Sequence, residues 1–386
     1  MPLTVGVLKE TLEAETRVAL TPEISAKLNK LGVSIVMERD AGAGSQLLDS
    51  AYEGVEFTDA DGVLGKCGLL LTVQPPAAAT VEKLGEGSVT AGFVYGHLHA
   101  DLVRALKEKG HTAFAMELVP RISRAQSMDV LSSQAAAAGY QAALIAASTL
   151  DKFFPMLTTA AGTIRPAQVL VIGAGVAGLQ AIATAKRLGA VVKGYDVRGA
   201  TKEQVQSLGA KFVETGVSAE GAGGYARELT EEEKQKQQAA LEKEIAVSDV
   251  VISTAAIPGR PAPKIISAAA VRTMMPGAVI VDLAAETGGN CELTRAGETV
   301  VENKVKIVGP VNLPAKLGRH ASEMYARNLF NFLSPAISEG ELKIDWEDEV
   351  FASTVLTHGG EVKHEGTRQS LEAKKATATD DQGTDR

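Results

Sequence analysis

The chain has 386 residues, of which 45% are hydrophobic, so it is long enough for about two or three domains with buried cores. Its net charge of −8 argues against a nucleic-acid-binding surface, which needs clustered lysine and arginine. The two cysteines, Cys67 and Cys291, fit neither a disulfide framework nor a metal spacing, so we expect a reducing compartment and no metal site.

The first 130 residues predict strands that alternate with helices. The predicted strands are LTVGVL, VSIVME, GLLLTV, VTAGFVY and TAFAMEL. A helix is predicted to begin at Pro22, after a capping hydroxyl on Thr21, and to end near Gly32. This alternation predicts parallel strand pairing and α/β layering.

A second unit of the same kind begins near Pro166. Its predicted strands are QVLVIGAG, AVVKGYDV, VSDVVISTA, GAVIVDLA and VKIVG, and VAGLQAIATAKRLG predicts a helix. Long helices are expected near residues 133–150 and 321–334. The segment EVFASTVLTHGGEVKH predicts a strand pair around His358–Glu361.

These elements predict an α/β protein of two doubly wound, Rossmann-like domains, joined by long helices and with a cleft between them. We expect the first domain to be discontinuous, with residues 1–132 and 320–364, and the second to span residues 133–319. Residues 365–386 are polar and are predicted to form a disordered tail. No apolar run reaches the roughly 18 residues of a membrane helix, and strand-like LTVGVLK leaves no room for a signal peptide.

A dinucleotide-binding turn is predicted where GAGVAG follows the first strand of the second domain. Gly173, Gly175 and Gly178 form the GxGxxG pattern, which permits a tight turn, approach of the backbone to a pyrophosphate, and close helix packing. The helix that begins near Val176 offers free N–H groups to the phosphates. Ala174, within the turn, is included in the predicted site. Residues 133–319 are therefore predicted to bind a dinucleotide.

The end of the next strand predicts which dinucleotide is bound. Asp196 lies 18 residues after Gly178 and is expected to accept hydrogen bonds from the adenosine ribose, together with neighbouring Val197. Its charge would repel a 2′-phosphate, which favours NAD(H) over NADP(H). Arg198 leaves an alternative open, because an arginine here either pairs with a 2′-phosphate or lies over the adenine or in solvent.

Three further positions complete the predicted nucleotide site. Ala255 ends the VSDVVISTA strand, and Glu286 lies in a polar, glycine-rich turn after GAVIVDLA. For Glu286, a helix cap or a surface carboxylate is an equally good interpretation. Residues 216–229 are rich in glycine, so we expect a loop that opens and closes, with Tyr225 packing over the nucleotide.

The stretch RISRAQSMDVLSSQ carries more hydrogen-bonding groups than a passive connector needs. Together with GAGVAGLQAIATAKRLGA and DVRGATKEQVQSLGAKF, it resembles the NAD(H)-binding component of proton-translocating nicotinamide nucleotide transhydrogenase. The resemblance covers about residues 3 to 360 and includes AGGYA, VIVDLAAETGGN and SEMYARNLFNFL.

This resemblance implies an oxidoreductase and translocase that works with partners. The family's component is a homodimer that holds NAD(H) in the interdomain cleft and docks on a membrane-spanning subunit and an NADP(H)-binding subunit. It implies a cytoplasmic chain attached to the inner membrane through those subunits. It also implies that Arg121, Asp129 and Ser132 position the nicotinamide carboxamide and that Gln126 reaches toward the partner's NADP(H). A helix-capping role for Asp129 or Ser132 is also open.

Two other functions are weighed against this one. An alanine dehydrogenase-like amino-acid dehydrogenase would use Arg17 and His97, with Glu286 near its acidic residue, but Gln74 replaces the lysine expected after GLLLTV. A non-catalytic NAD-binding module that signals redox state would not need the loop at residues 121–134.

Overall fold

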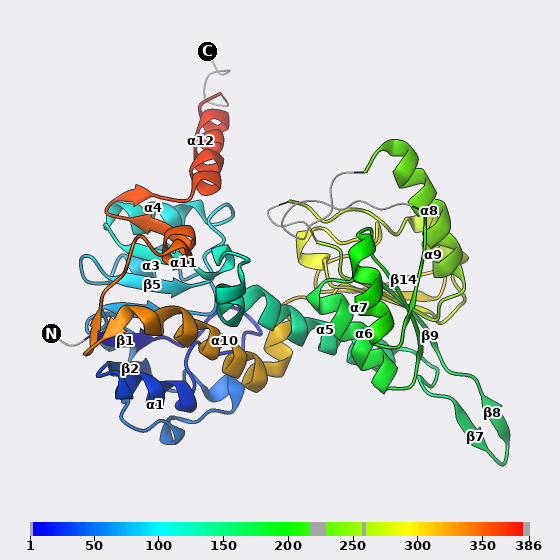
Figure 1. Ribbon diagram of the computed structural model, residues 1–386, viewed down its shortest axis with the longest axis horizontal. Helices are drawn as coiled ribbons and strands as arrows, with labels where there is room; N and C mark the ends of the chain where they lie inside the picture. The colour runs from blue at the N-terminus through cyan, green and yellow to red at the C-terminus, as the bar shows by residue number, and fades with distance from the viewer. Residues whose placement is uncertain (1–2, 217–228, 257–259, 381–386) are drawn as a thin grey trace. The chain divides into compact units, whose positions relative to one another are not determined.

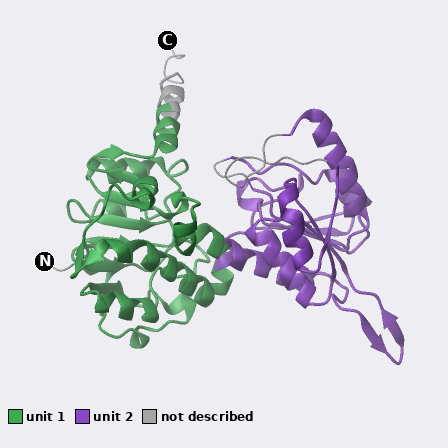
Figure 2. Cartoon of the chain, viewed as in Figure 1, with its two compact units in different colours: residues 1–134, 315–386 green, residues 135–314 purple. Residues whose placement is uncertain are grey.

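The computed structural model describes residues 3–216, 229–256 and 260–380, which form two compact units (Figures 1 and 2). Unit 1 contains residues 1–134 and 315–386, and unit 2 contains residues 135–314. The chain therefore crosses between the units twice, once inside a long helix and once after Pro314. Within the described residues, no helix is both long enough and apolar enough to span a membrane.

Unit 1 is built on an eight-stranded sheet with the order β19-β18-β6-β5-β4-β1-β2-β3. The strands from β6 to β3 are parallel, whereas β18 and β19 are antiparallel. The strand bounds are β1 (Thr4–Val7), β2 (Ser34–Glu38), β3 (Glu56–Thr58), β4 (Leu69–Leu71), β5 (Val89–Gly92), β6 (Thr112–Ala115), β18 (Val355–His358) and β19 (Glu361–Val362). The chain order reverses at β1, so the carboxyl ends of β1 and β4 form a switch point where ligands bind in such sheets.

Helices cover both faces of this sheet, because apolar side chains point alternately to either side of each buried strand. They are α1 (Pro22–Lys30), α2 (Ala60–Leu64), α3 (Ala78–Val81), α4 (Ala100–Glu108), α10 (Gly318–Leu333), α11 (Glu349–Thr354) and α12 (Glu365–Asp380). One core contains residues of α1, α10 and α11, and the other contains residues of α2, α3 and α4. Pro22 begins α1 as predicted, but the Thr21 hydroxyl makes no capping hydrogen bond.

Two predictions for the end of the chain differ from the structure. The strand pair around His358–Glu361 is confirmed, but residues 349–354 form helix α11, which the Asp348 side chain caps by accepting from Val350 N–H at 2.8 Å. The segment expected to be a disordered tail forms α12 up to Asp380, where Thr367 is buried and Leu371 packs on the core. Residues 381–386 lie outside the described residues.

Unit 2 contains a seven-stranded sheet with the order β11-β10-β9-β12-β13-β15-β14, parallel except for β14. The strands are β9 (Gln168–Ile172), β10 (Val191–Tyr195), β11 (Lys211–Phe212), β12 (Val250–Ser253), β13 (Val279–Asp282), β14 (Thr299–Glu302) and β15 (Val305–Val308). Its helices are α5 (Val130–Thr149), which begins in unit 1, α6 (Val176–Arg187), α7 (Lys202–Ser207), α8 (Glu231–Ala246) and α9 (Ala268–Thr273). Residues of α5 and α6 pack on one face and residues of α8 and α9 on the other.

Two small hairpins lie outside these sheets. Strands β16 (Ile337–Ser338) and β17 (Glu341–Leu342) pair in unit 1. Strands β7 (Leu157–Thr159) and β8 (Gly162–Ile164) pair only with each other and extend away from the rest of unit 2 (Figure 1). Short 3₁₀ helices complete the described fold: η1 (Ala43–Ser45), η2 (Asp49–Ala51), η3 (Met116–Leu118), η4 (Ser123–Met128), η5 (Gly199–Thr201), η7 (Ala285–Thr287), η8 (Leu313–Leu317) and η9 (Ser334–Ala336).

Candidate functional site

The glycine turn of unit 2 has the geometry that its sequence predicts. Gly173, directly after β9, has φ +95°, a left-handed conformation that favours glycine. A Cβ on Gly178 would lie 1.8 Å from the carbonyl oxygen of Gly173, so the start of α6 packs against the turn as only glycine allows. Gly175 and Val176, in contrast, are exposed, and a Cβ on Gly175 would meet no atom within 4 Å. The open side of the turn is therefore the first turn of α6, whose N–H groups favour an anion.

Asp196 follows β10, beside the glycine turn, and its carboxylate is 7% exposed. Its Oδ2 accepts a hydrogen bond from Ala174 N–H at 2.8 Å. Arg198 folds back onto the same carboxylate, with its Nε 2.8 Å from Oδ1 and its Nη2 2.7 Å from Oδ2. Arg198 therefore neither lies in solvent alone nor points away from Asp196; the two side chains form a bidentate ion pair, with Val197 half-buried between them in sequence.

The end of β12 borders the other side of the turn. The Thr254 hydroxyl donates to the carbonyl oxygen of Gly173 at 3.0 Å. Ala255 is held by the buried side chain of Asn290, which accepts from Ala255 N–H at 3.1 Å and donates to its carbonyl oxygen at 2.8 Å. Because β10, β9 and β12 are neighbours, the glycine turn, Asp196 and Ala255 all lie at one edge of the sheet. The role of Asn290 was not predicted.

Other predicted residues of this unit lie apart from that group. Glu286 is exposed in η7 after β13, and its Oε1 accepts a hydrogen bond from Asn312 N–H at 3.3 Å. Asp282, which ends β13, is fully buried and accepts hydrogen bonds from Ser253, Ala284, Cys291 and Thr294. Asp282 therefore has a structural role in this turn. Tyr225, predicted to close over a nucleotide, lies outside the described residues.

In unit 1, the polar loop contains the 3₁₀ helix η4 and leads into α5. Asp129 immediately precedes α5 and accepts two hydrogen bonds from Ser132, one from the backbone N–H at 2.9 Å and one from the hydroxyl at 2.6 Å. Asp129 therefore caps the helix, which was the alternative left open by the sequence. Arg121 and Gln126 are exposed on the same loop. All four predicted loop residues are thus brought together on one short segment.

A buried polar cluster lies at the switch point of the unit 1 sheet. Arg17, which is 4% exposed, donates from Nη2 to Glu15 Oε2 at 2.6 Å and from Nη1 to Gln134 Oε1 at 2.9 Å. Gln74 donates from Nε2 to Glu15 Oε2 at 2.7 Å. Burial by itself would raise the pKa of Glu15, but the hydrogen bonds and charge of Arg17 outweigh it and lower this pKa to about 2. The positive charge of Arg17 is therefore balanced inside the protein. His97 is half-buried on the turn after β5.

Two further buried carboxyl groups in this region were not predicted. Glu10 accepts hydrogen bonds from the N–H groups of Val73 at 2.6 Å and of Gln74 at 3.2 Å, and burial raises its pKa to about 7. Glu117 accepts from the N–H groups that follow β5, and burial raises its pKa too. Both lie at the carboxyl ends of strands. In the sequence they look like ordinary surface acids, so their burial depends on the tertiary structure.

We predict that Glu10→Gln will change the pH dependence of stability. The folded protein binds the Glu10 proton more tightly than the unfolded chain does, so this contribution to stability is fully present below the unfolded pKa and is lost as pH rises through about 7. Urea unfolding should therefore show the variant gaining on the wild type by up to about 3 kcal/mol between about pH 4.5 and about pH 8. Exposed Glu13→Gln is the control, and an offset that stays constant with pH would contradict the prediction.

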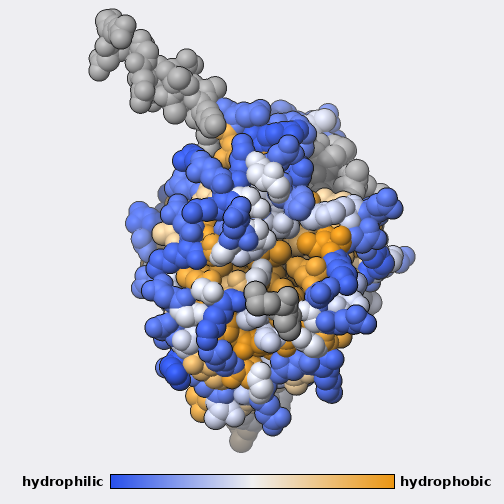
Figure 3. Space-filling model, turned by 90° about the vertical axis from the view of Figure 1, so that its left-hand side faces the viewer, coloured by the Kyte–Doolittle hydropathy of each residue, from blue (hydrophilic) through white to orange (hydrophobic). Residues whose placement is uncertain are grey.

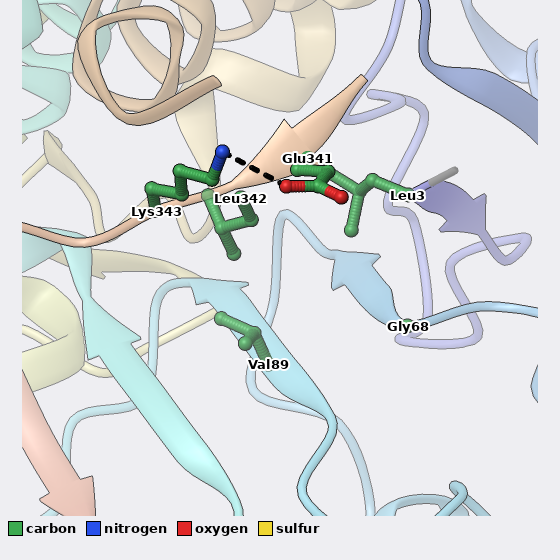
Figure 4. Close-up of a pocket in the computed structure, with 6 residues that line it drawn as sticks. All are labelled: Leu3, Gly68, Val89, Glu341, Leu342 and Lys343. Carbon is green, nitrogen blue, oxygen red and sulfur yellow. Dashed lines mark ion pairs between the residues drawn. The ribbon is translucent and has the colours of Figure 1, made fainter. Parts of the chain in front are cut away.

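The largest surface pocket is not at these groups. It has a volume of about 370 Å³ and lies at the amino ends of β1, β4 and β5, the opposite edge of the sheet from the polar loop. Figure 4 shows its apolar lining and the ion pair of Glu341 with Lys343, whose charged atoms are 2.9 Å apart. On the face of unit 1 seen in Figure 3, apolar residues gather toward the middle and hydrophilic residues surround them. None of the predicted site residues lines this pocket.

Comparison with protein families covers both units. Residues 6–138 match the N-terminal domain of alanine dehydrogenase/PNT, and residues 142–365 match the C-terminal domain of alanine dehydrogenase/PNT. The chain belongs to the alanine dehydrogenase/PNT family. The predicted recognition and the α/β fold of two Rossmann-like domains are thereby confirmed.

Within this family, the transhydrogenase members are the more similar of those compared. The first portion of NAD(P) transhydrogenase subunit alpha of Rhodospirillum rubrum, a separate chain, is 46% identical over 374 residues, covering 93% of this chain and 97% of the relative. The crystal structure of transhydrogenase from Sinorhizobium meliloti has a TM-score of 0.83 and 42% identity, covering 94% of this chain and 99% of that one. A solved L-alanine dehydrogenase has a TM-score of 0.80 at 22% identity, covering 96% and 99%, and this likeness shows the shared fold.

Proposed function

We propose that this chain is the NAD(H)-binding subunit of a proton-translocating NAD(P) transhydrogenase. It would hold NADH for direct hydride transfer to NADP⁺ on a partner subunit, coupled to proton translocation by membrane subunits. The observation that carries the proposal is the loop of unit 1, where exposed Arg121 and Gln126 lie beside the Asp129–Ser132 cap on an anchored segment. The similarity to the transhydrogenase subunit of Rhodospirillum rubrum supports it.

The residues of unit 2 fit the adenosine and pyrophosphate of a dinucleotide. The space beside Gly175 lets a pyrophosphate reach the N–H groups at the start of α6, as an added Cβ there would meet no protein atom. Asp196, Val197 and Arg198 would bind the ribose, and Ala255 would border the nucleotide at the end of β12. The Glu286 carboxylate and the Tyr225 hydroxyl complete the proposed set, the first at the same sheet edge.

The ion pair of Asp196 with Arg198 supports a preference for NAD(H). A 2′-phosphate would meet the Asp196 carboxylate, and the Arg198 charge that would attract it is already paired. Asp196→Ala should weaken NADH binding by about 1–2 kcal/mol in calorimetry and narrow the gap between NADH and NADPH, because Arg198 is released. The double variant Asp196→Ala/Arg198→Met should lose the gain for NADPH. Unchanged NADH affinity in the single variant would contradict this role.

Hydride transfer needs orientation more than it needs reactive side chains. NADH supplies the hydride from its dihydronicotinamide ring. The protein has to hold that ring at the transfer distance and exclude water, and such positioning contributes up to about 7–11 kcal/mol in favourable cases. Arg121, Asp129 and Ser132 would orient the carboxamide, and the exposed Gln126 side chain would reach toward the partner's nucleotide.

We propose a homodimer that recruits a membrane-spanning subunit and an NADP(H)-binding subunit on the cytoplasmic face of the inner membrane. The β7–β8 hairpin supports the dimer. Its two short strands have no third strand and both faces are exposed, an arrangement that is marginal in water by itself. Phe153, Met156 and Ile164 at its base and strands are 53%, 64% and 41% exposed. A second copy of this chain would cover them.

Replacing those three residues with serine should separate the dimer. The triple variant Phe153→Ser/Met156→Ser/Ile164→Ser loses apolar area that a partner would bury, so the dissociation constant should rise about 100-fold or more. Sedimentation at several protein concentrations measures it. Met275→Ser removes an equally exposed side chain just after α9 and is the control. A triple variant that associates like the wild type would rule out the hairpin as the interface.

A reconstitution with three arms tests the function as a whole. The chain is mixed with an NADP(H)-binding transhydrogenase subunit, and hydride transfer to an NAD analogue is followed. Separately, NADH oxidation is measured with pyruvate and ammonium. We expect transfer with the partner and no pyruvate-dependent oxidation, since the charge of Arg17 is balanced by Glu15 and Gln74 is neutral. Oxidation by pyruvate would favour an alanine dehydrogenase-like function, and NADH binding with neither activity would favour a redox sensor.

A further inference from the structure

The polar loop of unit 1 is held from below by two asparagines of α10. Asn328 Nδ2 donates to the carbonyl oxygen of Ser127 at 2.8 Å, and Asn331 Nδ2 donates to the same oxygen at 3.0 Å. A carbonyl oxygen has two acceptor positions, so the two amides together satisfy it fully. Ser127 lies directly between Gln126 and the buried Met128. The backbone beside Gln126 is thereby fixed to the helix.

A second anchor holds the other end of η4. Arg124 donates from Nη1 to Asp348 Oδ2 at 2.8 Å and from Nη2 to Asp348 Oδ1 at 2.5 Å, a bidentate pair. Asp348 is itself fixed, because it caps α11. Ala125 and Met128 place their side chains in the main core of unit 1. The loop is therefore tied to α10, to α11 and to the core, while Gln126 remains exposed.

Asn328 is placed at an energetic disadvantage that a purely structural residue would avoid. It is 8% exposed, and within the described part of the chain its Oδ1 has no hydrogen-bond partner. Burial of an unpaired polar atom opposes folding, and an apolar side chain in its place would not have this disadvantage. The return for this disadvantage is the hydrogen bond to Ser127. Short 3₁₀ segments have poor internal hydrogen bonds, so an external donor matters more here than in an α-helix.

We propose that Asn328 and Asn331, together with the Arg124–Asp348 pair, are positioning residues for hydride transfer. They hold the backbone of η4 so that Gln126 and the Asp129–Ser132 cap keep the orientation that transfer needs. This inference rests on the proposed function. It adds to that function a rigid support, built from α10 and the start of α11, that does not itself contact nucleotide.

The test exploits the two donors on one oxygen. Asn328→Ala and Asn331→Ala each leave one donor to Ser127, so each alone should change the transfer rate by no more than about 3-fold, whereas the double variant should lower it about 30–100-fold at saturating nucleotide. NADH affinity should stay within about 2-fold throughout, since the glycine turn and Asp196 are untouched. Arg327→Ala, on the neighbouring position of α10 and paired only at the surface with Glu23, is the matched control.

A variant that does not depend on the buried asparagines keeps the test open if the double variant folds poorly. Arg124 is more than half exposed, so Arg124→Met keeps its length and removes the pair without risk to the core. It should lower the transfer rate about 10-fold with unchanged NADH affinity, and hydrogen exchange of the 123–129 amides should quicken.

The possible results separate the two levels of the proposal. Normal transfer in both the double variant and Arg124→Met would overturn the positioning role while leaving the proposed function standing. Loss that is additive and accompanied by an equal loss of NADH affinity would also overturn it, because a general structural defect lowers both. A wild-type chain that gives no transfer with its partner would overturn the proposed function and this inference together.

Discussion

Gly175→Ala is expected to weaken NADH binding about 100-fold or more and to leave the melting temperature unchanged. The protein itself has room for the methyl group, because φ at Gly175 is −78° and no atom lies within 4 Å of the added Cβ. That methyl group would stand in front of the N–H groups at the start of α6, where the pyrophosphate is proposed to bind. Calorimetry with NADH and a thermal melt of the same sample measure the two effects.

Gly178→Ala gives the opposite pattern and serves as the comparison. Its Cβ would lie 1.8 Å from the carbonyl oxygen of Gly173, so unit 2 should lose stability and its melting temperature should fall by several degrees. Gly85→Ala, on an exposed turn of unit 1 where the nearest atom to the added Cβ is 3.7 Å away, controls for the substitution itself. If Gly175→Ala binds NADH like the wild type, the pyrophosphate does not lie on this turn.

Gln126→Asn is expected to slow hydride transfer about 100-fold with little change in NADH affinity, because orientation errors of about 1 Å have effects of this size. The shorter side chain keeps its amide but no longer reaches as far from the exposed surface of η4. Stopped-flow transfer with an NADP(H)-loaded partner subunit measures the rate, and calorimetry measures the affinity.

Ser123→Ala changes an exposed residue of the same loop and should transfer hydride like the wild type. The assigned role of Gln126 would be refuted if its asparagine variant bound NADH much more weakly but transferred hydride at the normal rate. Such a result would place Gln126 against the nucleotide of its own chain.

The nucleotide turn was predictable from sequence because its determinants are local. Gly173, Gly175 and Gly178 lie on one strand–turn–helix unit, and Asp196 ends the next strand, so spacing alone places them at one sheet edge. Asp129 and Ser132 are three residues apart, and the capping geometry also follows from that spacing.

Other features could not be predicted, because they depend on contacts between distant segments. Asn290 holds Ala255 across 35 residues of sequence, and Asn328 holds Ser127 across 201. Arg198 fits several roles until its guanidinium is seen on Asp196. In residues 349–354 the apolar pattern suits a short strand as well as a helix, and the Asp348 cap decides between them.

Asp196 meets its ligand with its hydrogen-bonding positions already filled by Ala174 and Arg198. A ribose hydroxyl therefore exchanges with an existing donor, and the net gain from each exchange is small. Such a grip favours quick release, since the lifetime of a complex follows its dissociation rate. A carrier that swaps reduced for oxidised nucleotide in every cycle benefits from loose retention at the ribose, and the specificity for the unphosphorylated form is kept without slow product departure.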